Sequence, residues 1–223
     1  MIVSIHQPTY LPYIGFFDKM KKSDVFVLYD TAQFVKNEFH NRNQIVTRNE
    51  PLWLTVPVSK DSYLQPLFKV KISNQSFWQR KHLKSIEQSY SKKPFFSKFF
   101  PKLNSIYEDK YDFLLDINIR LIEEIKDFFG IKTKIVRANY LDYDRSLKST
   151  DAIISICKTL GADTYLSGDG ARAYIETDKF KDLNLEFQNF KHPIYNQHLK
   201  GKNEFVPNLS AVDYLFNEGS KDW

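Results

Sequence analysis

The sequence has little cysteine and no long apolar run, and both absences narrow the class of protein. Its 223 residues include one cysteine, Cys157, which excludes an internal disulfide and favours a reducing environment. No apolar stretch approaches the length needed to cross a bilayer, and the first residues lack the basic segment and apolar core of a signal peptide. We therefore expect a cytoplasmic protein without a membrane span.

The sequence also lacks the common motifs of metal and serine chemistry. There is no H-E-x-x-H motif, no cysteine pair and no dense His/Asp cluster, so no metal site is expected. Ser167-Gly168 does not lie in a G-x-S-x-G elbow, and Cys157 falls in an apolar helical stripe, where burial keeps a thiol protonated and inert. Neither residue is therefore expected to act as a nucleophile.

Long blocks of basic residues are absent as well. The formal net charge is +5, which favours anionic partners, but the Lys and Arg residues are spread along the chain. This spacing disfavours nucleic acid as a partner. Nucleotide sugars and other phosphorylated small molecules remain the expected ligands.

The opening stretch, residues 2–17, is the segment around which the rest of the chain is expected to be organised. A short apolar run ends in His6-Gln7, passes through a loop braced by Pro8 and Pro12, and leads into an amphipathic segment. A second apolar run follows at residues 25–30, so this region is expected to be a βαβ unit with parallel strands. Ligands of such sheets bind beyond the carboxyl ends of the strands, where we expect His6, Gln7 and Asp30.

The rest of the chain extends this pattern into an α/β fold. Helical spacing over residues 76–130 predicts a helical insertion or layer, and a further helix is expected from Ser149 or Thr150 to Leu160. The 42% hydrophobic content can supply the core of one domain over residues 1–223. We predict a Rossmann-like, HUP-like, mostly parallel sheet with flanking helices, which strands at residues 44–47, 52–58 and 68–72 would make mixed. Further strands are expected at residues 134–137, 164–166 and 185–190.

A small-residue loop follows the strand at residues 164–166. Ser167-Gly168-Asp169-Gly170 leads into an expected helix start, which would place backbone N–H groups where they could hold a phosphate or carboxylate. Gly168, Gly170 and Ala173 match the G-x-G-x-x-A spacing of dinucleotide sites, but the next strand ends in Lys191-His192 instead of an acid for the ribose. A tight turn that simply needs glycine remains the alternative.

Histidines and acids near strand ends are the candidate catalytic groups. His6, His192 and His198 follow strands or lie beside prolines, where a histidine can act as a general base or bind phosphate. For a single histidine the alternative is one fixed hydrogen bond in a loop, but the setting of His6 favours a functional role. Asp30 and Asp169 could orient a histidine or bind sugar hydroxyls, or could cap their own turns.

Several stretches of the sequence form a recognisable set of motifs. They are His6-Gln7-Pro8 with Tyr10, Pro12, Gly15 and Phe16, Asn41-Arg42-Asn43, residues 54–58, Tyr165-Leu166-Ser167-Gly168, His192-Pro193 with Tyr195 and Gln197, and Leu209-Ser210 with Asp213 and residues 215–217. Together they resemble the WbqC-like family over essentially the whole chain. The resemblance implies a role in bacterial gene clusters for O-antigen and other surface polysaccharides.

The opening also resembles nucleotidylyltransferases of the HUP type, which begin with a strand, a P-x-H-x-G-H loop and a helix. Tyr13, Gly15 and Phe16 stand where that motif has His, Gly and His. The architecture is therefore expected to match, whereas both phosphate-contacting histidines are missing. This departure disfavours adenylyl transfer.

The leading hypothesis is an enzyme that transfers an acyl or aminoacyl group to an amine of a nucleotide-linked sugar, from coenzyme A or a carrier-protein thioester. A nucleotidylyltransferase-like enzyme and a non-catalytic nucleotide-sugar sensor or scaffold remain the alternatives, with an acyl carrier protein as a further partner. The expected catalytic group is His6 as general base with Asp30 and Asp169. The expected binding residues are Lys36 and Arg42 for phosphate, Ser167, Gly168 and Gly170 as backbone donors, Tyr195 and Gln197 for the sugar or acyl group, and Gln7, Tyr13, Asn43 and His192.

Overall fold

The computed structural model describes residues 1–47, 50–74, 76–197 and 205–223, and it divides the chain into two compact units. Both units draw on segments that lie far apart in the sequence. Unit 1 comprises Met1–Gln7, Gly15–Thr31 and Lys132–Lys191. Unit 2 comprises Pro8–Ile14, Ala32–Ile131 and His192–Trp223.

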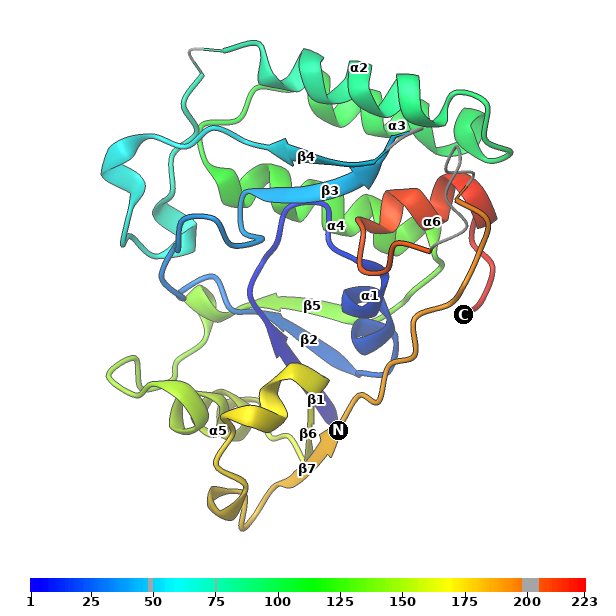
Figure 1. The fold of residues 1–223 in the computed structure, drawn as a ribbon. Helices are drawn as coiled ribbons and strands as arrows, with labels where there is room; N and C mark the ends of the chain where they lie inside the picture. The colour runs from blue at the N-terminus through cyan, green and yellow to red at the C-terminus, as the bar shows by residue number, and fades with distance from the viewer. Residues whose placement is uncertain (48–49, 75, 198–204) are drawn as a thin grey trace. The chain divides into compact units, whose positions relative to one another are not determined.

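Unit 1 is built on a five-stranded sheet in which every strand pair is parallel (Figure 1). This sheet confirms the α/β, Rossmann-like fold, whereas the expectation of a mixed sheet is wrong, because the antiparallel strands pair only with each other in unit 2. In spatial order the strands are β5 (Lys134–Arg137), β2 (Val25–Leu28), β1 (Ile2–His6), β6 (Thr164–Ser167) and β7 (Asn184–Phe187).

Two helices cover opposite faces of this sheet. Helix α1 (Ile14–Lys21) packs Phe16 against Phe26 of β2, with ring centroids 4.9 Å apart. Helix α5 (Ser149–Leu160) buries Ile156 with Val3 of β1 on the other face. Alternate β1 side chains point to opposite faces, and right-handed crossovers running in opposite directions put their helices on opposite sides. The expected βαβ unit over residues 2–30 is thus confirmed.

The helix expected after the Ser167–Gly170 loop is replaced by a 3₁₀ turn over Asp169–Ala173. The side chain of Asp169 accepts hydrogen bonds from the backbone of Asn189 and Phe190, at 3.1 and 2.9 Å. It is therefore engaged with the segment after β7 and does not cap a helix of its own. Helix α5 ends as expected, with Gly161 in the left-handed region at φ 68°.

Unit 2 contains the helices expected from residues 76–130 and a two-stranded hairpin (Figure 1). Its core is aromatic: Phe99 packs edge-on against Phe128 and also contacts Phe216, with centroids 5.1 and 5.8 Å away. The expectation of one domain over residues 1–223 stays a prediction. The elements of unit 2 are β3 (Arg42–Val46), β4 (Pro51–Thr55), α2 (Trp78–Tyr90), α3 (Phe96–Glu108), α4 (Leu114–Phe128) and α6 (Ala211–Glu218).

The strand expected at residues 68–72 is not formed. Leu67–Lys69 is a 3₁₀ turn, and the residues after it make only isolated bridges. The alternating burial of this segment has a different cause, because its backbone groups bond to two separate segments: Ser59 N donates to Lys71 O, whereas Ile72 N donates to Asp112 O and Leu114 N donates to Val70 O. Buried and exposed residues therefore alternate in this segment without the pairing of a β-strand. No helix among the described residues has the length and apolar character to cross a membrane.

Candidate functional site

The carboxyl edge of the unit 1 sheet carries His6 and Gln7. His6 is the last residue of β1, and its backbone oxygen accepts a hydrogen bond from Tyr29 N of the neighbouring strand at 2.8 Å. Strand β1 lies between β2 and β6, and the chain order reverses at β1 and β6. Ligands of doubly wound sheets bind at such a switch point, beyond the strand ends.

The ring of His6 is held in one orientation. Its Nδ1 lies 2.9 Å from the carbonyl oxygen of Gln7, and the ring packs edge-on against Phe16 with centroids 4.9 Å apart. A carbonyl oxygen only accepts hydrogen bonds, so Nδ1 carries the proton. In the neutral ring the lone pair is then on Nε2, which is the tautomer that a general base working through Nε2 requires.

The loop after β6 begins at the same edge of the sheet as His6. Strands β1 and β6 pair in parallel through Ile2–Thr164 and Val3–Tyr165, and Ser4 of β1 donates to Leu166 O of β6 at 3.0 Å. Ser167 is buried and its hydroxyl lies 3.4 Å from Gly168 O, while Gly170 is exposed. The structure thus brings two of the expected groups, His6 and the Ser167–Gly170 loop, to one edge.

Asp169 has a local structural role in this loop. Burial alone would raise its pKa, but the hydrogen bonds from the backbone of Phe190 and Asn189 and from the Arg172 side chain outweigh burial and lower the pKa. The carboxylate is therefore ionised and acts as an acceptor. Its predicted catalytic role stays a prediction.

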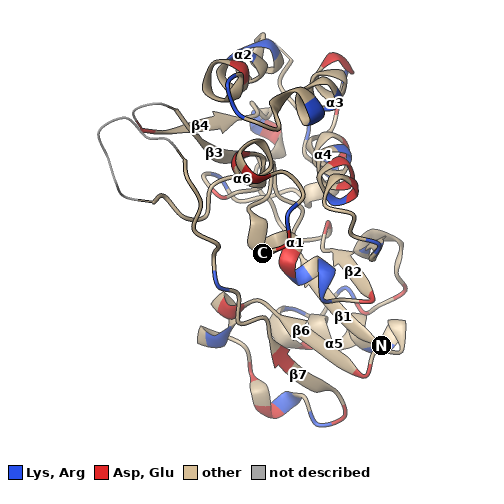
Figure 2. Ribbon diagram, turned by 90° about the vertical axis from the view of Figure 1, so that its right-hand side faces the viewer, with Lys and Arg blue, Asp and Glu red and all other residues tan. Residues whose placement is uncertain are grey.

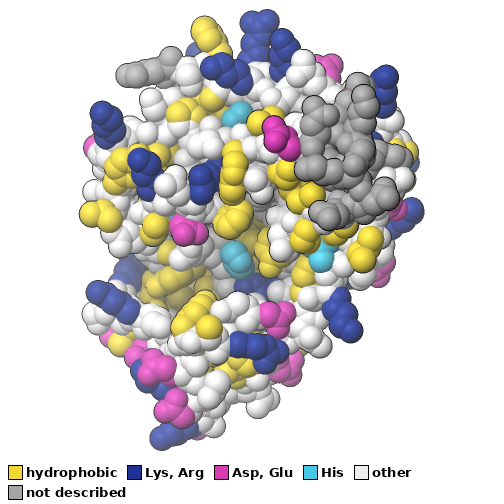
Figure 3. All heavy atoms as spheres, viewed as in Figure 1, with side chains coloured by type: hydrophobic (Ala, Val, Ile, Leu, Met, Phe, Trp, Pro, Cys, Tyr) yellow, Lys and Arg dark blue, Asp and Glu magenta, His cyan; other side chains and the backbone are white. Residues whose placement is uncertain are grey.

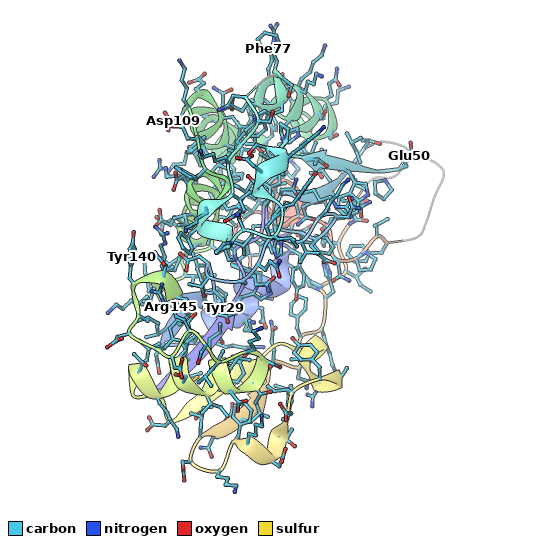
Figure 4. The ribbon with its side chains drawn as sticks, turned by 90° about the vertical axis from the view of Figure 1, so that its left-hand side faces the viewer. Tyr29, Glu50, Phe77, Asp109, Tyr140 and Arg145 are labelled. Carbon is cyan, nitrogen blue, oxygen red and sulfur yellow. The ribbon has the colours of Figure 1, made fainter. Side chains whose placement is uncertain are left out.

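Asp30 makes its bonds on the side of β5. It is completely buried, its Oδ2 accepts from Arg137 Nε at 2.8 Å, and its Oδ1 accepts from Asn139 N at 2.8 Å. Tyr140 stacks on the same guanidinium, 4.7 Å from the ring centroid, and Figure 4 shows Tyr140 at the β5 end of unit 1. These contacts give Asp30 a part in fixing the loop after β5, and its catalytic role stays a prediction.

A buried lysine that the sequence analysis missed lies under the same edge. Lys19 of α1 is 4% exposed, and its Nζ donates to Ile5 O at 3.1 Å. Burial lowers the pKa of Lys19 to about 7. A lysine in an amphipathic helix normally faces water, so only the apolar positions around it, Phe16 and Met20, could have signalled its burial.

In unit 2, Asn43 fixes the proline-braced loop. Its Nδ2 donates to Leu11 O at 2.7 Å, and its Oδ1 accepts from Gln44 N at 2.8 Å. Leu11 has φ 45°, which side-chain-bearing residues rarely adopt, so this bond stabilises a strained turn. Tyr13, in the same loop, forms an isolated antiparallel bridge with Ser210. Asn43 is therefore a positioning residue for this loop, and its predicted binding role stays a prediction.

The two residues expected to hold phosphate lie in unit 2. Arg42 stacks on Trp53, with its guanidinium carbon 4.2 Å from the ring centroid, and donates to Asn37 O. Lys36 is exposed, and its Nζ lies 5.8 Å from the Tyr63 ring. Both cations thus lie against aromatic rings, and their predicted phosphate contacts stay a prediction.

A buried carboxylate joins Tyr195 and Gln197 in unit 2. Asp213 of α6 accepts from the Tyr195 hydroxyl at 2.6 Å, from Gln197 Nε2 at 3.2 Å and from the Tyr90 hydroxyl at 2.7 Å. Burial raises the pKa of Asp213, and these donors partly oppose the rise. The polar ends of Tyr195 and Gln197 therefore fix the segment before α6, and their predicted sugar or acyl contacts stay a prediction. His192 stacks beside Tyr195, and burial lowers its pKa.

The expected site residues are thus divided between the two units. Unit 1 holds His6, Gln7, Asp30 and Ser167–Gly170, while the others are in unit 2. His198 lies outside the described residues. No group of three His, Cys, Asp or Glu residues that could hold a metal ion occurs within the described ranges.

Unit 2 also has an open hollow of about 620 Å³ at the start of α2, lined in part by Phe77, Arg80, Asn104 and Asp112. Phe77 is 83% exposed and projects away from the helices in Figure 4. None of the predicted catalytic or substrate-binding residues lines this hollow. We therefore place the candidate site at the carboxyl edge of the unit 1 sheet.

Comparison with known proteins gives the family. Residues 7–223 match the WbqC-like protein family. The chain belongs to this family. This WbqC-like protein is also 30% identical over 220 residues to the uncharacterized protein Rv1507c of Mycobacterium tuberculosis, a match that covers 98% of the present chain and 94% of the relative. No solved structure matches the chain.

Charge is distributed as the sequence suggested. Figure 2 shows basic and acidic positions spread along the ribbon in both units, and Figure 3 shows charged side chains of both signs scattered over one face. The expectation that nucleic acid is not a partner stays a prediction.

Proposed function

We propose that this WbqC-like protein is a transferase of bacterial surface-polysaccharide biosynthesis, including that of O-antigen, which acylates or aminoacylates an amine of a nucleotide-linked sugar. The acyl donor is a thioester of coenzyme A or of a carrier protein. The proposal is supported by the family, by the parallel sheet with a switch point, and by the side chains at its carboxyl edge.

The observation that carries the proposal is the orientation of His6. The Gln7 carbonyl holds the proton on Nδ1, which leaves the lone pair of the neutral ring on Nε2. In the proposed reaction the sugar amine attacks the thioester carbonyl, a C–N bond forms and the C–S bond breaks. His6 Nε2 accepts the proton from the nitrogen and passes it to the departing thiolate.

Predicted residues of unit 1 support His6 in this proposal. Gly168 and Gly170 let substrate approach the backbone at the edge of the sheet, Gln7 and Ser167 bind substrate there, and Asp169 and Asp30 hold loops that follow β6 and β5. The roles of the predicted residues of unit 2 stay predictions: phosphate binding for Lys36 and Arg42, contact with the sugar or acyl group for Tyr195 and Gln197, and binding for Tyr13, Asn43 and His192.

Product analysis with a panel of nucleotide-linked amino sugars and acyl thioesters tests the proposal. We expect an amide product by mass spectrometry, and a His6→Ala variant whose turnover falls about 10²–10⁴-fold, the contribution typical of a general base. Added imidazole is expected to restore part of the lost rate, because a small base can occupy the vacated space. Full turnover in His6→Ala would disprove the role of His6.

The same panel separates the alternative functions. Mg²⁺-dependent release of pyrophosphate from a nucleoside triphosphate, without an amide product, would support a nucleotidylyltransferase. Tight binding of a nucleotide sugar by calorimetry, with no product from any donor, would support a non-catalytic sensor or scaffold. Either result would contradict the proposed transfer of an acyl or aminoacyl group to a sugar amine.

A further inference from the structure

Lys19 is buried without a carboxylate to neutralise it. Its Nζ donates to Ile5 O, and within the part of the chain that the structure describes no acidic side chain pairs with it. The neighbouring Asp18 is engaged elsewhere, because its Oδ2 accepts from Lys22 Nζ at 2.9 Å and from Gln188 Nε2 at 2.6 Å. An ammonium group in this position is costly to bury and lacks the counter-charge that buried cations usually have.

The ammonium lies at the switch point of the sheet. Ile5, whose carbonyl it contacts, is the penultimate residue of β1, and Gly168 follows the last residue of β6. A Cβ built on Gly168 would lie 3.8 Å from Lys19 Nζ. The lysine head group is therefore between the carboxyl ends of the two strands where the chain order reverses, beside His6.

The backbone conformation at position 168 does not require glycine. Its φ is −72° and its ψ is 152°, an ordinary extended conformation that any residue adopts. What the glycine leaves out is a side chain directed toward Lys19 Nζ. A side chain at this position would be in van der Waals contact with the ammonium, whereas glycine leaves the Cβ position beside Nζ unfilled.

We propose that Lys19 is an anion-binding residue at the carboxyl edge of the unit 1 sheet, and that it takes a phosphoryl group of the ligand between β1 and Gly168. The ligand supplies the counter-charge that the protein lacks, so the energetic cost of burying the lysine is offset only in the complex. This proposal deepens the proposed function, since a nucleotide-linked sugar carries a diphosphate. It does not depend on transfer chemistry.

Calorimetry with inorganic pyrophosphate and with uridine diphosphate tests the proposal on the intact chain. We expect the wild type to bind at least one of the two, and Lys19→Met to bind it at least tenfold more weakly. Lys19→Gln, which keeps a donor for Ile5 O but loses the charge, is expected to fail in the same way. Lys134→Met removes an exposed lysine at the amino end of β5, away from the carboxyl edge of the sheet. This variant is expected to bind the anion as tightly as the wild type does.

A second variant tests the space beside the ammonium. Gly168→Ala meets no atom closer than 3.8 Å and needs no change of φ, so it should fold normally and still weaken anion binding. Circular dichroism and thermal melting check that each variant is folded. Wild-type affinity in Lys19→Gln or Gly168→Ala, or no binding of either anion by the wild type, would overturn the proposal. Lys19-dependent binding without any transfer product would leave it standing while the transferase fails.

Discussion

At the scale of single residues, the buried charge of Lys19 lowers the stability of the folded protein. A lysine held at a pKa of about 7 must be charged at low pH inside the protein, while the unfolded chain titrates near 10.5. Between these two values the unfolded state binds more protons than the folded state, so the stability of the wild type rises with pH across this window. Below about pH 7 the full cost of the buried charge is present.

Replacing Lys19 with methionine is therefore expected to stabilise the protein at pH 7. Methionine fills a similar volume without a charge, and the gain should be about 1 to 4 kcal/mol after the loss of the bond to Ile5 O. The difference in stability between Lys19→Met and the wild type should become smaller toward pH 9.5, where the wild-type lysine is neutral in the folded state. Urea unfolding of both proteins at pH 7 and pH 9.5 measures the difference.

Lys134→Met is the matched control, because this lysine is exposed and its removal should change stability by less than about 0.5 kcal/mol. A Lys19→Met variant that is less stable than the wild type at pH 7 would show that the lysine is held for structural reasons. A stabilised variant with weakened anion binding would instead identify a residue retained for function at the expense of stability.

At the scale of elements, a buried polar cluster joins four parts of unit 2. The Tyr10 hydroxyl lies 2.8 Å from His82 Nδ1 of α2 and also contacts the Tyr107 hydroxyl of α3. The ring also bonds the backbone of Thr55, so its two nitrogens have distinct roles and Nδ1 accepts from Tyr10. The proline-braced loop, the hairpin and two helices thus depend on a neutral histidine.

This cluster predicts an acid-sensitive step in unfolding. Burial lowers the pKa of His82 to about 4, so the folded state favours the neutral ring. Its stabilisation is fully present above the unfolded pKa near 6.5 and is lost as pH falls toward 4, where the unfolded state binds more protons. Between pH 7 and pH 4 the wild type should lose about 3 kcal/mol through this residue.

His82→Phe isolates the effect. The variant is expected to be less stable at pH 7, since Tyr10 loses its acceptor, but its stability should depend less on pH between 7 and 4. Denaturation by urea at several pH values gives both slopes. Equal slopes in the two proteins would mean that His82 does not titrate in this window.

At the scale of the whole molecule, the sequence predicted what short-range patterns determine. The β1-α1-β2 unit follows from two apolar runs separated by one helix length, and the helices of residues 76–130 follow from their apolar spacing. Strand order across the sheet, with β6 beside β1, depends on pairings between distant segments that no local pattern specifies. The expected strand at residues 68–72 failed for the same reason, because its partners are separate loops.

In the candidate site, too, local patterns predicted some residues, whereas others depended on contacts between distant segments. His6 was found because it ends a strand, whereas Lys19 was missed because burial of a helical lysine depends on what covers the helix. Asp213 was part of the family resemblance, but its role became visible only when Tyr90, Tyr195 and Gln197 were brought around it. The spacing of Ser210 and Asp213 also fits a capping box, but the Asp213 carboxylate accepts from side chains that are distant in the sequence.

The interleaved topology makes the fold of unit 1 depend on both halves of the chain. Strands β1 and β2 precede residue 132, and β5, β6 and β7 follow it, yet β2 pairs with β5 and β1 pairs with β6. A fragment of residues 1–132 retains two strands of the five-stranded sheet, and residues 133–223 retain the other three, which do not form one continuous sheet. Neither can bury the sheet faces that α1 and α5 cover.

We therefore expect the strands of unit 1 to be unfolded in each fragment alone, and the native spectrum to return when the two fragments are refolded together, as followed by ¹H–¹⁵N correlation spectra. The intact chain with a protease site inserted after the exposed Lys132, cleaved only after folding, is the control and should keep its native spectrum. Native dispersion of the β1 and β2 amides in the isolated 1–132 fragment would contradict the prediction, because those strands would then be stable without β5 and β6. Failure of the mixed fragments to refold, beside a folded cleaved control, would place the barrier in assembly kinetics, since pairings of high sequence separation form slowly.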